Sequence, residues 1–484
     1  MKKIFLFLTL VAFLTGCSLD INKDPNYPSD VSATLLLPAV QNSIAATVGD
    51  GMYNYAGFFA QYYDQMPEAN QYNEFVDYSF LESTQVIDRS YRTLYAGALE
   101  DVDVILKDKT ASEADKFVAT ALRAFSFQLL VDNMDKAPYT EALKGSEIPM
   151  PKWDDGKTVY EGVLTELDDA EAKLGSDQIT CSDLVLNKDL KQWIGFANAL
   201  RLRMYLRMHD GGIDMTSKIK ALIDKNAFFT GDIKYDVFSD EDSKRNPWYA
   251  ANKVSLAMNH VASYPIISYL KYTKDPRIAY NFVKATNTNE YVGELPGAKA
   301  VLTKKKNADY SFLNYYATKP VYFFTQSELQ FLLSESYIRF YNNDTQAQAA
   351  YEAGISADFS ARDLTDPSVM YGAAGTVKWS SATTNAAKLE LIYMQKWVAL
   401  CYMDHMEAWS EIRRTDVPKL SSKTADQINT DPTVYSAGDL IIPMRNVLGT
   451  SLVKRMYFPS TARQLNDNTP ASVPASTPVW WDIK

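Results

Sequence analysis

The chain has 484 residues, 13% aromatic side chains and a formal net charge of −10 at neutral pH. An acidic protein repels phosphate backbones, so this charge argues against a nucleic-acid partner. The length is well above what one hydrophobic core requires and leaves room for more than one compact unit.

The first element is a short apolar run, residues 4–15, which follows two lysines and ends in Leu-Thr-Gly-Cys. Its length suits a signal-peptide core of about 7–15 residues, whereas a membrane-spanning helix needs about 20. Small Gly16 suits cleavage, and the thiol of Cys17 is the nucleophile that lipid attachment requires. We therefore expect residues 1–16 to be a lipoprotein signal peptide and Cys17 to carry a lipid that anchors the protein to a membrane. An ordinary secretory signal with an accidental cysteine is the alternative.

A polar segment with two prolines follows the cysteine. Proline lacks a backbone N–H and interrupts helices, so we expect residues 17–45 to be a lipidated, extended tether. Asp20, Asn22 and Asp24 imitate the start of a calcium loop, but the glycine and the glutamate that such a loop requires are missing. We therefore expect no metal there.

Helical periodicity dominates residues 46–230, which we expect to form the first part of a helical scaffold. Ser112 marks the start of one helix, and Thr158 with Glu161 gives the capping-box pattern of another. A further helix is expected to begin near Asp189. Three of its side chains should bind neighbouring carboxylates and carbonyls, and not a ligand: Arg201, Arg203 and Arg207.

Prolines and glycines interrupt residues 231–320 repeatedly. We expect this section to be irregular and to face a ligand, because binding residues gather on loops that a rigid scaffold holds. In residues 321–415, two consecutive helical patterns resemble one hairpin of a tetratricopeptide array. A single long helix is expected from about Asn385 to Arg414, and residues 416–484 look mostly irregular.

Residues with catalytic chemistry are few and scattered. The three histidines lie in separate segments and the two remaining cysteines are far apart, so we predict no catalytic residue, no metal and no cofactor. Asp404, His405 and Glu407 come nearest to a catalytic set, but three polar residues on one helix usually form a solvated face or a structural network. Acidic pairs such as Asp168 and Asp169 leave a glycan hydrolase open, because sequence does not give the distance between two carboxylates.

Aromatic residues are more informative: the chain has 31 tyrosines, 22 phenylalanines and 8 tryptophans. Four of them have the spacing of a helix core and are interpreted as packing: Tyr55, Phe58, Phe59 and Tyr62. Sugars present flat C–H faces that stack on aromatic rings, while their hydroxyls bind amides and carboxylates. The candidate ligand-binding residues are Trp248, Tyr249 and Asn246 in the irregular section, followed by Tyr72 and Tyr264, with core packing as the alternative for each.

Several segments, taken in order, resemble the SusD/RagB family of outer-membrane lipoproteins, in particular its SusD-like branch. They include LRAFSFQLLVDNMDKAPYTEALKG from Leu122, KQWIGFANALRLRMYLRM from Lys191, SELQFLLSESYIR from Ser327, EAWSEIRRTDVPKL from Glu407 and the closing VWWD. The resemblance covers nearly the whole mature chain. Near the end, Phe458 and Ala462 replace a tyrosine and a glutamate of the family pattern, which removes the hydrogen-bonding groups of those two side chains.

The resemblance implies a mainly α fold, with tetratricopeptide-like helical hairpins as the scaffold and a loop-rich, ligand-facing section. It also implies a lid on a SusC-like TonB-dependent transport barrel, which captures glycans or other nutrients at the surface of the outer membrane. Our hypothesis is a non-enzymatic lipoprotein, anchored through Cys17, that binds an oligosaccharide and hands it to the barrel. The alternatives are a surface glycan hydrolase and a purely structural lid without ligand affinity.

Overall fold

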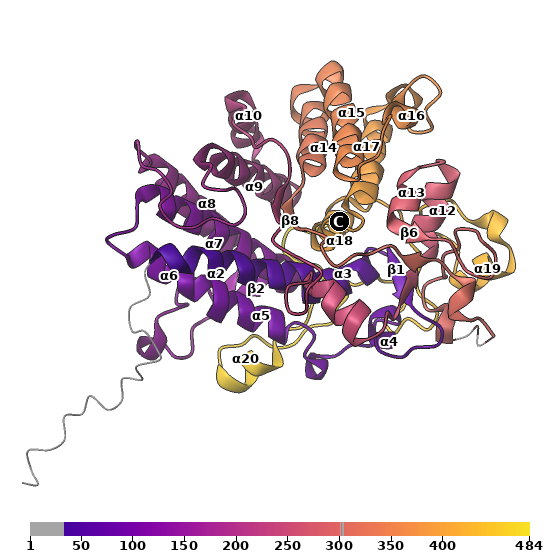
Figure 1. Ribbon diagram of the computed structural model, residues 1–484, viewed down its shortest axis with the longest axis horizontal. Coiled ribbons are helices and arrows are strands. Elements are labelled where there is room, and N and C mark those ends of the chain that lie inside the picture. The colour runs from indigo at the N-terminus through magenta and orange to yellow at the C-terminus, as the bar shows by residue number, and fades with distance from the viewer. Residues whose placement is uncertain (1–32, 301, 303) are drawn as a thin grey trace, which may run out of the picture.

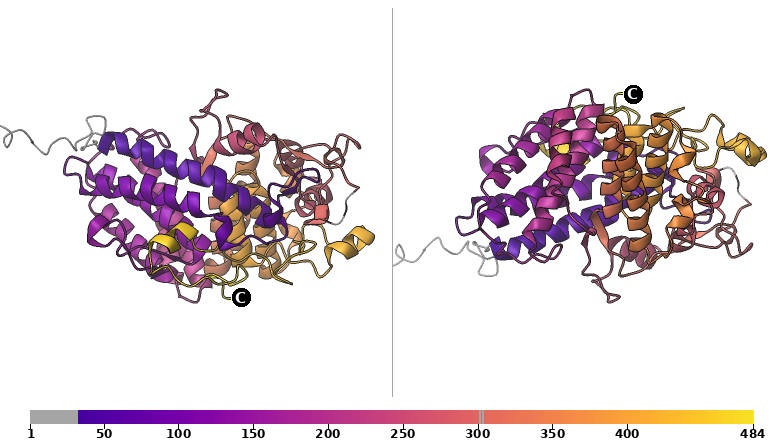
Figure 2. Two further views of the ribbon diagram at one scale, coloured as in Figure 1. Left: turned by 90° about the horizontal axis from the view of Figure 1, so that it is seen from below. Right: turned by 90° about the horizontal axis from the view of Figure 1, so that it is seen from above.

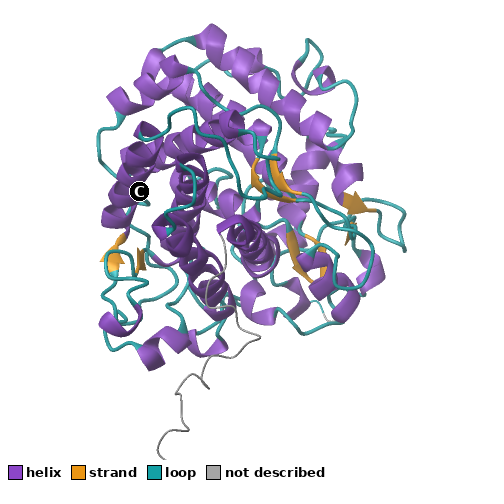
Figure 3. Ribbon diagram, turned by 60° about the vertical axis from the view of Figure 1, so that its left-hand side comes forward, coloured by secondary structure: helices purple, strands orange, loops and turns teal. Residues whose placement is uncertain are grey.

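The computed structural model describes residues 33–300, 302 and 304–484, and helices are its main element (Figure 1, Figure 3). The mainly α fold predicted from the sequence is therefore confirmed. The expected signal peptide, residues 1–16, and the lipid site Cys17 lie outside the described residues. Within the part that the structure describes, no helix is both long enough and apolar enough to cross a membrane.

The first half of the chain forms a layer of packed helices. Its elements are α2 (Ala33–Ala46), α3 (Met52–Phe59), β1 (Tyr63–Gln65), α4 (Asn73–Val76), α5 (Asp88–Leu94), α6 (Glu100–Lys107), α7 (Glu113–Met134), β2 (Lys136–Ala137), β3 (Asp154–Asp155), α8 (Gly156–Ala172), α9 (Leu190–Asp210) and α10 (Thr216–Lys225). Helix α6 packs against both α2 and α7, and α7 also packs against α8 and α9. The predicted helix starts are confirmed at Ser112, whose Oγ accepts the backbone N–H of Asp115, and at Asp189, which caps α9.

Two expectations for this half are wrong. Helix α2 begins at Ala33, inside the expected tether of residues 17–45, because Leu37, Val40 and Ile44 recur at helical spacing and are buried. Helix α8 begins at Gly156 and not at a cap formed by Thr158, because pairing of β3 with β2 ends the extended backbone at Asp155. In both cases burial or pairing with a distant segment decides where the helix begins.

Most helices of the second half stand beside those of the first along the long axis of the molecule, whereas α20 packs against α5 of the first half (Figure 2). They are α14 (Gln326–Ser336), α15 (Asp344–Ala361), α16 (Ser368–Tyr371), α17 (Asn385–Leu400), α18 (His405–Thr415), α19 (Ala425–Thr430) and α20 (Ser460–Leu465). Helices α14 and α15 pack closely against each other and form the expected tetratricopeptide-like hairpin. The predicted single helix from Asn385 to Arg414 is wrong, because Tyr402 has a positive φ of 65° and the Asp404 side chain caps a new helix, α18.

Short elements fill residues 231–320. They are β4 (Ile233–Tyr235), α11 (Pro247–Tyr249), β5 (His260–Ala262), α12 (Tyr264–Tyr272), α13 (Arg277–Asn281), β6 (Phe282–Val283) and β7 (Phe312–Leu313), and β8 (Val321–Phe324) follows directly. Antiparallel pairing gives one sheet of order β1-β5-β7-β6 and a second of β4 with β8. Both sheets therefore hold this section against segments from elsewhere in the chain.

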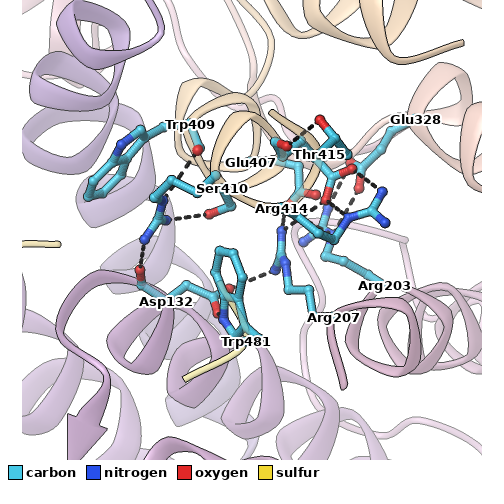
Figure 4. Close-up of polar contacts among 12 residues, drawn as sticks. Asp132, Arg203, Arg207, Glu328, Glu407, Trp409, Ser410, Arg414, Thr415 and Trp481 are labelled. Atoms are coloured by element: carbon cyan, nitrogen blue, oxygen red, sulfur yellow. Dashed lines mark hydrogen bonds and ion pairs between the residues drawn. The ribbon is translucent and has the colours of Figure 1, made fainter. Parts of the chain in front are cut away.

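A buried charge network joins the two halves at the centre of the molecule (Figure 4). Arg203 pairs with Glu328 of α14 at 2.7 Å, and Arg207 pairs with Asp132 of α7 at 2.7 Å and with Glu407 of α18 at 2.6 Å. Each of these arginines is almost completely buried and has a carboxylate from another helix. Arg201 pairs with Asp168 and Glu171, so all three arginines bind carboxylates, as the sequence predicts.

Candidate functional site

A cleft of about 510 Å³ lies where the end of α2 meets the irregular section of the chain. We call it the α2 cleft. Its lining comes from α2, from the π-helical turn Thr47–Gly51 that follows it, from α5 and from residues 235–255. The cleft therefore combines rigid helices with the loop-rich section in which the sequence predicts ligand contacts.

One wall of the α2 cleft is aromatic and apolar. Tyr235 ends β4, and its hydroxyl donates to Asn42 Oδ1 over 3.2 Å. The Phe238 ring packs against Tyr235 with a centroid distance of 5.5 Å, and the neighbouring Val237 side chain is 47% exposed. This wall offers the apolar contact surface that the face of a sugar ring requires.

The rim of the α2 cleft carries charge of both signs. Arg89 Nη1 lies 3.4 Å from Asp50 Oδ2, and burial raises the pKa of Asp50 while Arg89 opposes this effect. Arg245 pairs with Asp240 at 2.7 Å and with Asp242 at 2.8 Å. Two guanidinium groups, one carboxylate and the Asn42 amide thus surround the aromatic wall and provide donors and acceptors for hydroxyl groups.

The cleft lacks the carboxylate pair that a glycoside hydrolase uses. Asp50 is the one carboxylic acid among its lining residues, while Asp240 and Asp242 are held by Arg245. Hydrolysis of a glycosidic bond ordinarily requires two carboxyl groups facing each other across the bond. The arrangement is suited to binding a polar, flat-faced ligand.

Two of the predicted ligand residues lie beneath the surface. Trp248 has no exposed surface, and its indole N–H donates to Asn54 Oδ1 over 3.2 Å. Asn246 is equally buried, accepts the backbone N–H of Tyr249 and donates from Nδ2 to the backbone oxygen of Lys319. In this structure neighbouring groups use the ring faces and polar atoms that a ligand would need, so direct ligand contact of these two residues stays a prediction and would require the section to open.

The other three predicted residues are partly exposed and do not meet at one place. Tyr249 lies on α11, two residues after Pro247, which lines the α2 cleft. The Tyr72 hydroxyl donates to Asn252, and the Tyr264 ring packs against Tyr435. Their contact with a ligand stays a prediction, and it is best supported for Tyr249.

The catalytic lookalike on α18 is a structural network. Asp404 caps the helix and Glu407 pairs with Arg207. The His405 ring stacks on Tyr53 with a centroid distance of 3.7 Å, and burial lowers its pKa well below the usual range. All three side chains are buried, so of the two interpretations the structural network holds and the solvated face does not.

Sequence reasoning missed most residues of the α2 cleft. Asn42, Asp50, Arg89 and Phe238 come from three segments that no local pattern connects. Phe238 carried a weak signal, because it follows a short alternating strand within the section that the sequence already predicts to face a ligand. The other three become neighbours only through tertiary packing.

Comparison with known sequences gives two matches. A family model described as starch-binding and associating with the outer membrane matches residues 25–436. A model of the prokaryotic membrane lipoprotein lipid attachment site matches residues 1–18, where the sequence analysis places Cys17. No match was found among curated proteins.

Solved structures share the fold at low sequence identity. A chitin-binding SusD homologue from Flavobacterium johnsoniae has a TM-score of 0.74 and 21% identity, with 92% of this chain and 99% of that chain covered. A SusD homologue from Bacteroides uniformis has a TM-score of 0.70 and 21% identity, with 94% and 100% covered. A third, from Bacteroides vulgatus, has a TM-score of 0.72 and 20% identity, with 93% and 97% covered.

Proposed function

The chain belongs to the SusD-like family of starch-binding proteins that associate with the outer membrane, and on this premise we propose that it is a lipid-anchored, non-enzymatic receptor for an oligosaccharide. It presents the α2 cleft to the glycan at the cell surface and hands the glycan to a SusC-like TonB-dependent barrel. The observation that carries the proposal is the combination, in one open cleft, of an aromatic wall with amide, carboxylate and guanidinium groups.

The physical basis is the two-faced chemistry of sugars. A pyranose ring packs its C–H face on an aromatic side chain, while hydroxyls at its edge bind polar groups such as those of Asn42, Asp50 and Arg89. Because the cleft is open, individual sugar units remain accessible to a transport partner. Tyr249 is the nearest predicted ligand residue in sequence to this lining, because it follows Pro247 by two residues on α11.

Binding is tested with soluble protein that begins after Cys17, titrated with oligosaccharides by calorimetry. Chitin oligosaccharides and maltooligosaccharides are the first probes, because one structural relative is a chitin-binding protein and the family model names starch. We expect Phe238→Ala to weaken binding about tenfold, which corresponds to about 1.4 kcal/mol of lost ring contact. The matched control is Tyr272→Ala, which removes a ring that is 74% exposed and lies outside the cleft. Equal affinity of the two variants would contradict the proposed site.

The hydrolase alternative has a direct test at Asp50. Wild-type protein is incubated with each glycan that binds, and new reducing ends are measured. We expect none, and we expect Asp50→Asn to change affinity without changing any reaction rate. Release of product by wild-type protein, with loss of release in Asp50→Asn, would establish an enzyme.

Anchoring and partner are tested in cells that express the full chain. We expect metabolic labelling with a fatty acid to mark wild-type protein but not Cys17→Ser, and we expect the labelled protein to fractionate with the outer membrane. Gentle detergent extraction of tagged protein should recover a large β-barrel. A barrel recovered with protein that retains no glycan would support the purely structural lid instead.

A further inference from the structure

Two buried carboxylates lie close together and, in the part of the chain that the structure describes, form no ion pair with another side chain. They belong to Asp64 on β1 and to Glu294, just before the turn at residues 296–297. Their exposed fractions are 3% and 1%. Among the described residues, neither forms an ion pair with a lysine, an arginine or a histidine. Lys299 is the nearest cation, but its Nζ binds the side-chain oxygens of Asn70 and Asn73 at 2.7 and 2.9 Å.

The Asp64 carboxylate accepts hydrogen bonds, whereas the Glu294 carboxylate accepts none from the described residues. Asp64 accepts the backbone N–H groups of Gln65 at 2.7 Å and of Gly297 at 3.1 Å, each with a different oxygen. Both carboxylate oxygens of Glu294 are buried and have no hydrogen-bond partner. Burial, reinforced by the charge of Asp64, raises the pKa of Glu294 well above its usual range.

A third oxygen donor, independent of the two acids, points to the same place. The Ser263 hydroxyl is 1% exposed and also has no hydrogen-bond partner. Ser263 and Asp64 line one small internal cavity, and Ser263 pairs through its backbone with Glu294 in a parallel bridge. The antiparallel register of β1 with β5 places Asp64 opposite Val261, so Asp64 and Ser263 share one face of the sheet.

We propose that Asp64, Glu294 and Ser263 form a binding site for a divalent cation, with Ca²⁺ as its occupant. Burying two carboxylates is costly unless a positive charge compensates them, and the ammonium group of Lys299, which influences both, binds Asn70 and Asn73 and forms no ion pair with either acid. All the available donors are oxygens, which favours Ca²⁺ or Mg²⁺ over a transition metal. Glu294 has two free oxygens and can bind in the bidentate mode that Ca²⁺ accepts, whereas Mg²⁺ demands a stricter octahedron.

The proposed site offers few side chains that can coordinate a cation. Among the residues that the structure describes, no group of three or more histidine, cysteine, aspartate or glutamate side chains is placed to hold a metal. Backbone oxygens or water must therefore complete the coordination, which suits an affinity in the weaker range for calcium sites. The cation would hold together strand β1, residue Ser263 directly after β5, and the segment 293–297. The same segment fixes Tyr264, whose backbone N–H donates to the Glu294 carbonyl over 2.7 Å.

The test compares protein treated with a chelator and then titrated with CaCl₂, MgCl₂ or TbCl₃. We expect 1 mM Ca²⁺ to raise the melting temperature by about 3 °C, because a ligand that binds only the folded state stabilises it. We also expect saturable Tb³⁺ luminescence on tyrosine excitation, with Ca²⁺ displacing Tb³⁺ more effectively than Mg²⁺. Tyr63 on β1 and the buried Tyr310 are the nearby sensitisers.

The variants separate this site from adventitious binding. Glu294→Gln should abolish both responses, while Glu290→Gln, an exposed glutamate in the same section, should retain them. The Tb³⁺ measurement on wild-type protein needs no variant, so a misfolded Glu294→Gln would not decide the question. The proposal is overturned if wild-type protein shows no saturable Tb³⁺ signal and no Ca²⁺ effect, or if Glu294→Gln responds like wild type. Failure of this test leaves glycan binding by the α2 cleft unaffected, since the cleft contains none of these residues.

Discussion

Buried arginines of the helical scaffold have carboxylate partners, whereas the loop-rich section contains both paired charges, such as Arg277 with Asp275 and Asp358, and unpaired ones. At the centre of the scaffold, Arg203 and Arg207 each have carboxylate partners from other helices. In the loop-rich section, Glu294 and Lys319 are just as deeply buried, but Glu294 Oε1 and Oε2 and Lys319 Nζ have no hydrogen-bond partner.

This contrast distinguishes buried charged side chains that are paired, and so help to specify the fold, from buried charged atoms that have no hydrogen-bond partner in the described part of the protein. A buried charge that is paired and hydrogen-bonded fixes the relative position of the elements that carry it. A buried charge without a partner destabilises the fold, and such groups concentrate at functional sites. The helices of this protein therefore supply the rigid frame, and the loop-rich section carries the groups that a ligand, an ion or a proton can still satisfy.

The largest expected effect on stability is that of Arg207→Met, which removes a paired buried charge of the helical scaffold. It leaves Asp132 and Glu407 buried without their shared partner, which should lower the free energy of unfolding by about 3–5 kcal/mol. Urea denaturation followed by circular dichroism measures the loss. The control is Arg245→Met at the rim of the α2 cleft, whose partners Asp240 and Asp242 are exposed, and which should cost less than about 1 kcal/mol. Similar losses in both variants would contradict the distinction.

Sequence reasoning succeeded where the information is local. The caps at Ser112 and Asp189 depend on neighbours three residues away, and the structure confirms them. The end of α17 was also locally readable, because Asp404 with Glu407 three positions later is a helix start signal inside the expected long helix. Periodicity outweighed that signal in the prediction, since apolar residues continue at helical spacing across the break.

The ligand site was less predictable because burial depends on the whole fold. Trp248 stands among prolines in an irregular segment, which suggested a surface ring. Its burial comes from rings far away in sequence, among them Tyr315 and Tyr53 at centroid distances of 4.5 and 6.3 Å. The α2 cleft shows the opposite case. Asn42 and Arg89 line the cleft, but nothing in the sequence around them indicates that they will lie at a ligand site.

Lys319→Met removes an unpaired buried charge of the loop-rich section and should therefore change how the stability of the protein depends on pH. The Lys319 ammonium is 1% exposed and lies 5.4–5.9 Å from the centroids of four tyrosine rings. Burial, helped by the positive charges of Arg362 and Lys234, lowers its pKa to about 7, although the charge of Asp358 opposes the shift. The unfolded chain keeps the usual lysine pKa of about 10.4 and binds the proton more tightly, so wild-type stability should rise with pH above 7.

The expected gain for wild-type protein between pH 6 and pH 9 is about 2 kcal/mol, and Lys319→Met should lose this slope. At pH 6 the variant should be more stable than wild type, because it no longer buries an ammonium group without a hydrogen bond. Urea denaturation at four pH values measures both effects. Lys253→Met, which removes an exposed lysine of the same section that does not influence the Lys319 pKa, should keep the wild-type slope. A flat profile for wild-type protein would show that Lys319 finds a partner in solution.

Asn246→Ser gives the smallest expected change and tests what a buried amide does at the boundary between the two regions. The serine hydroxyl can still accept the backbone N–H of Tyr249, but it is too short to donate to the Lys319 carbonyl, which lies 2.8 Å from Nδ2 in the wild-type protein. Loss of this one hydrogen bond should lower the free energy of unfolding by about 1 kcal/mol. Glycan affinity measured by calorimetry should change less than twofold, because Asn246 has no exposed surface. A large loss of affinity with unchanged stability would place Asn246 in contact with the ligand and would require the loop-rich section to open on binding.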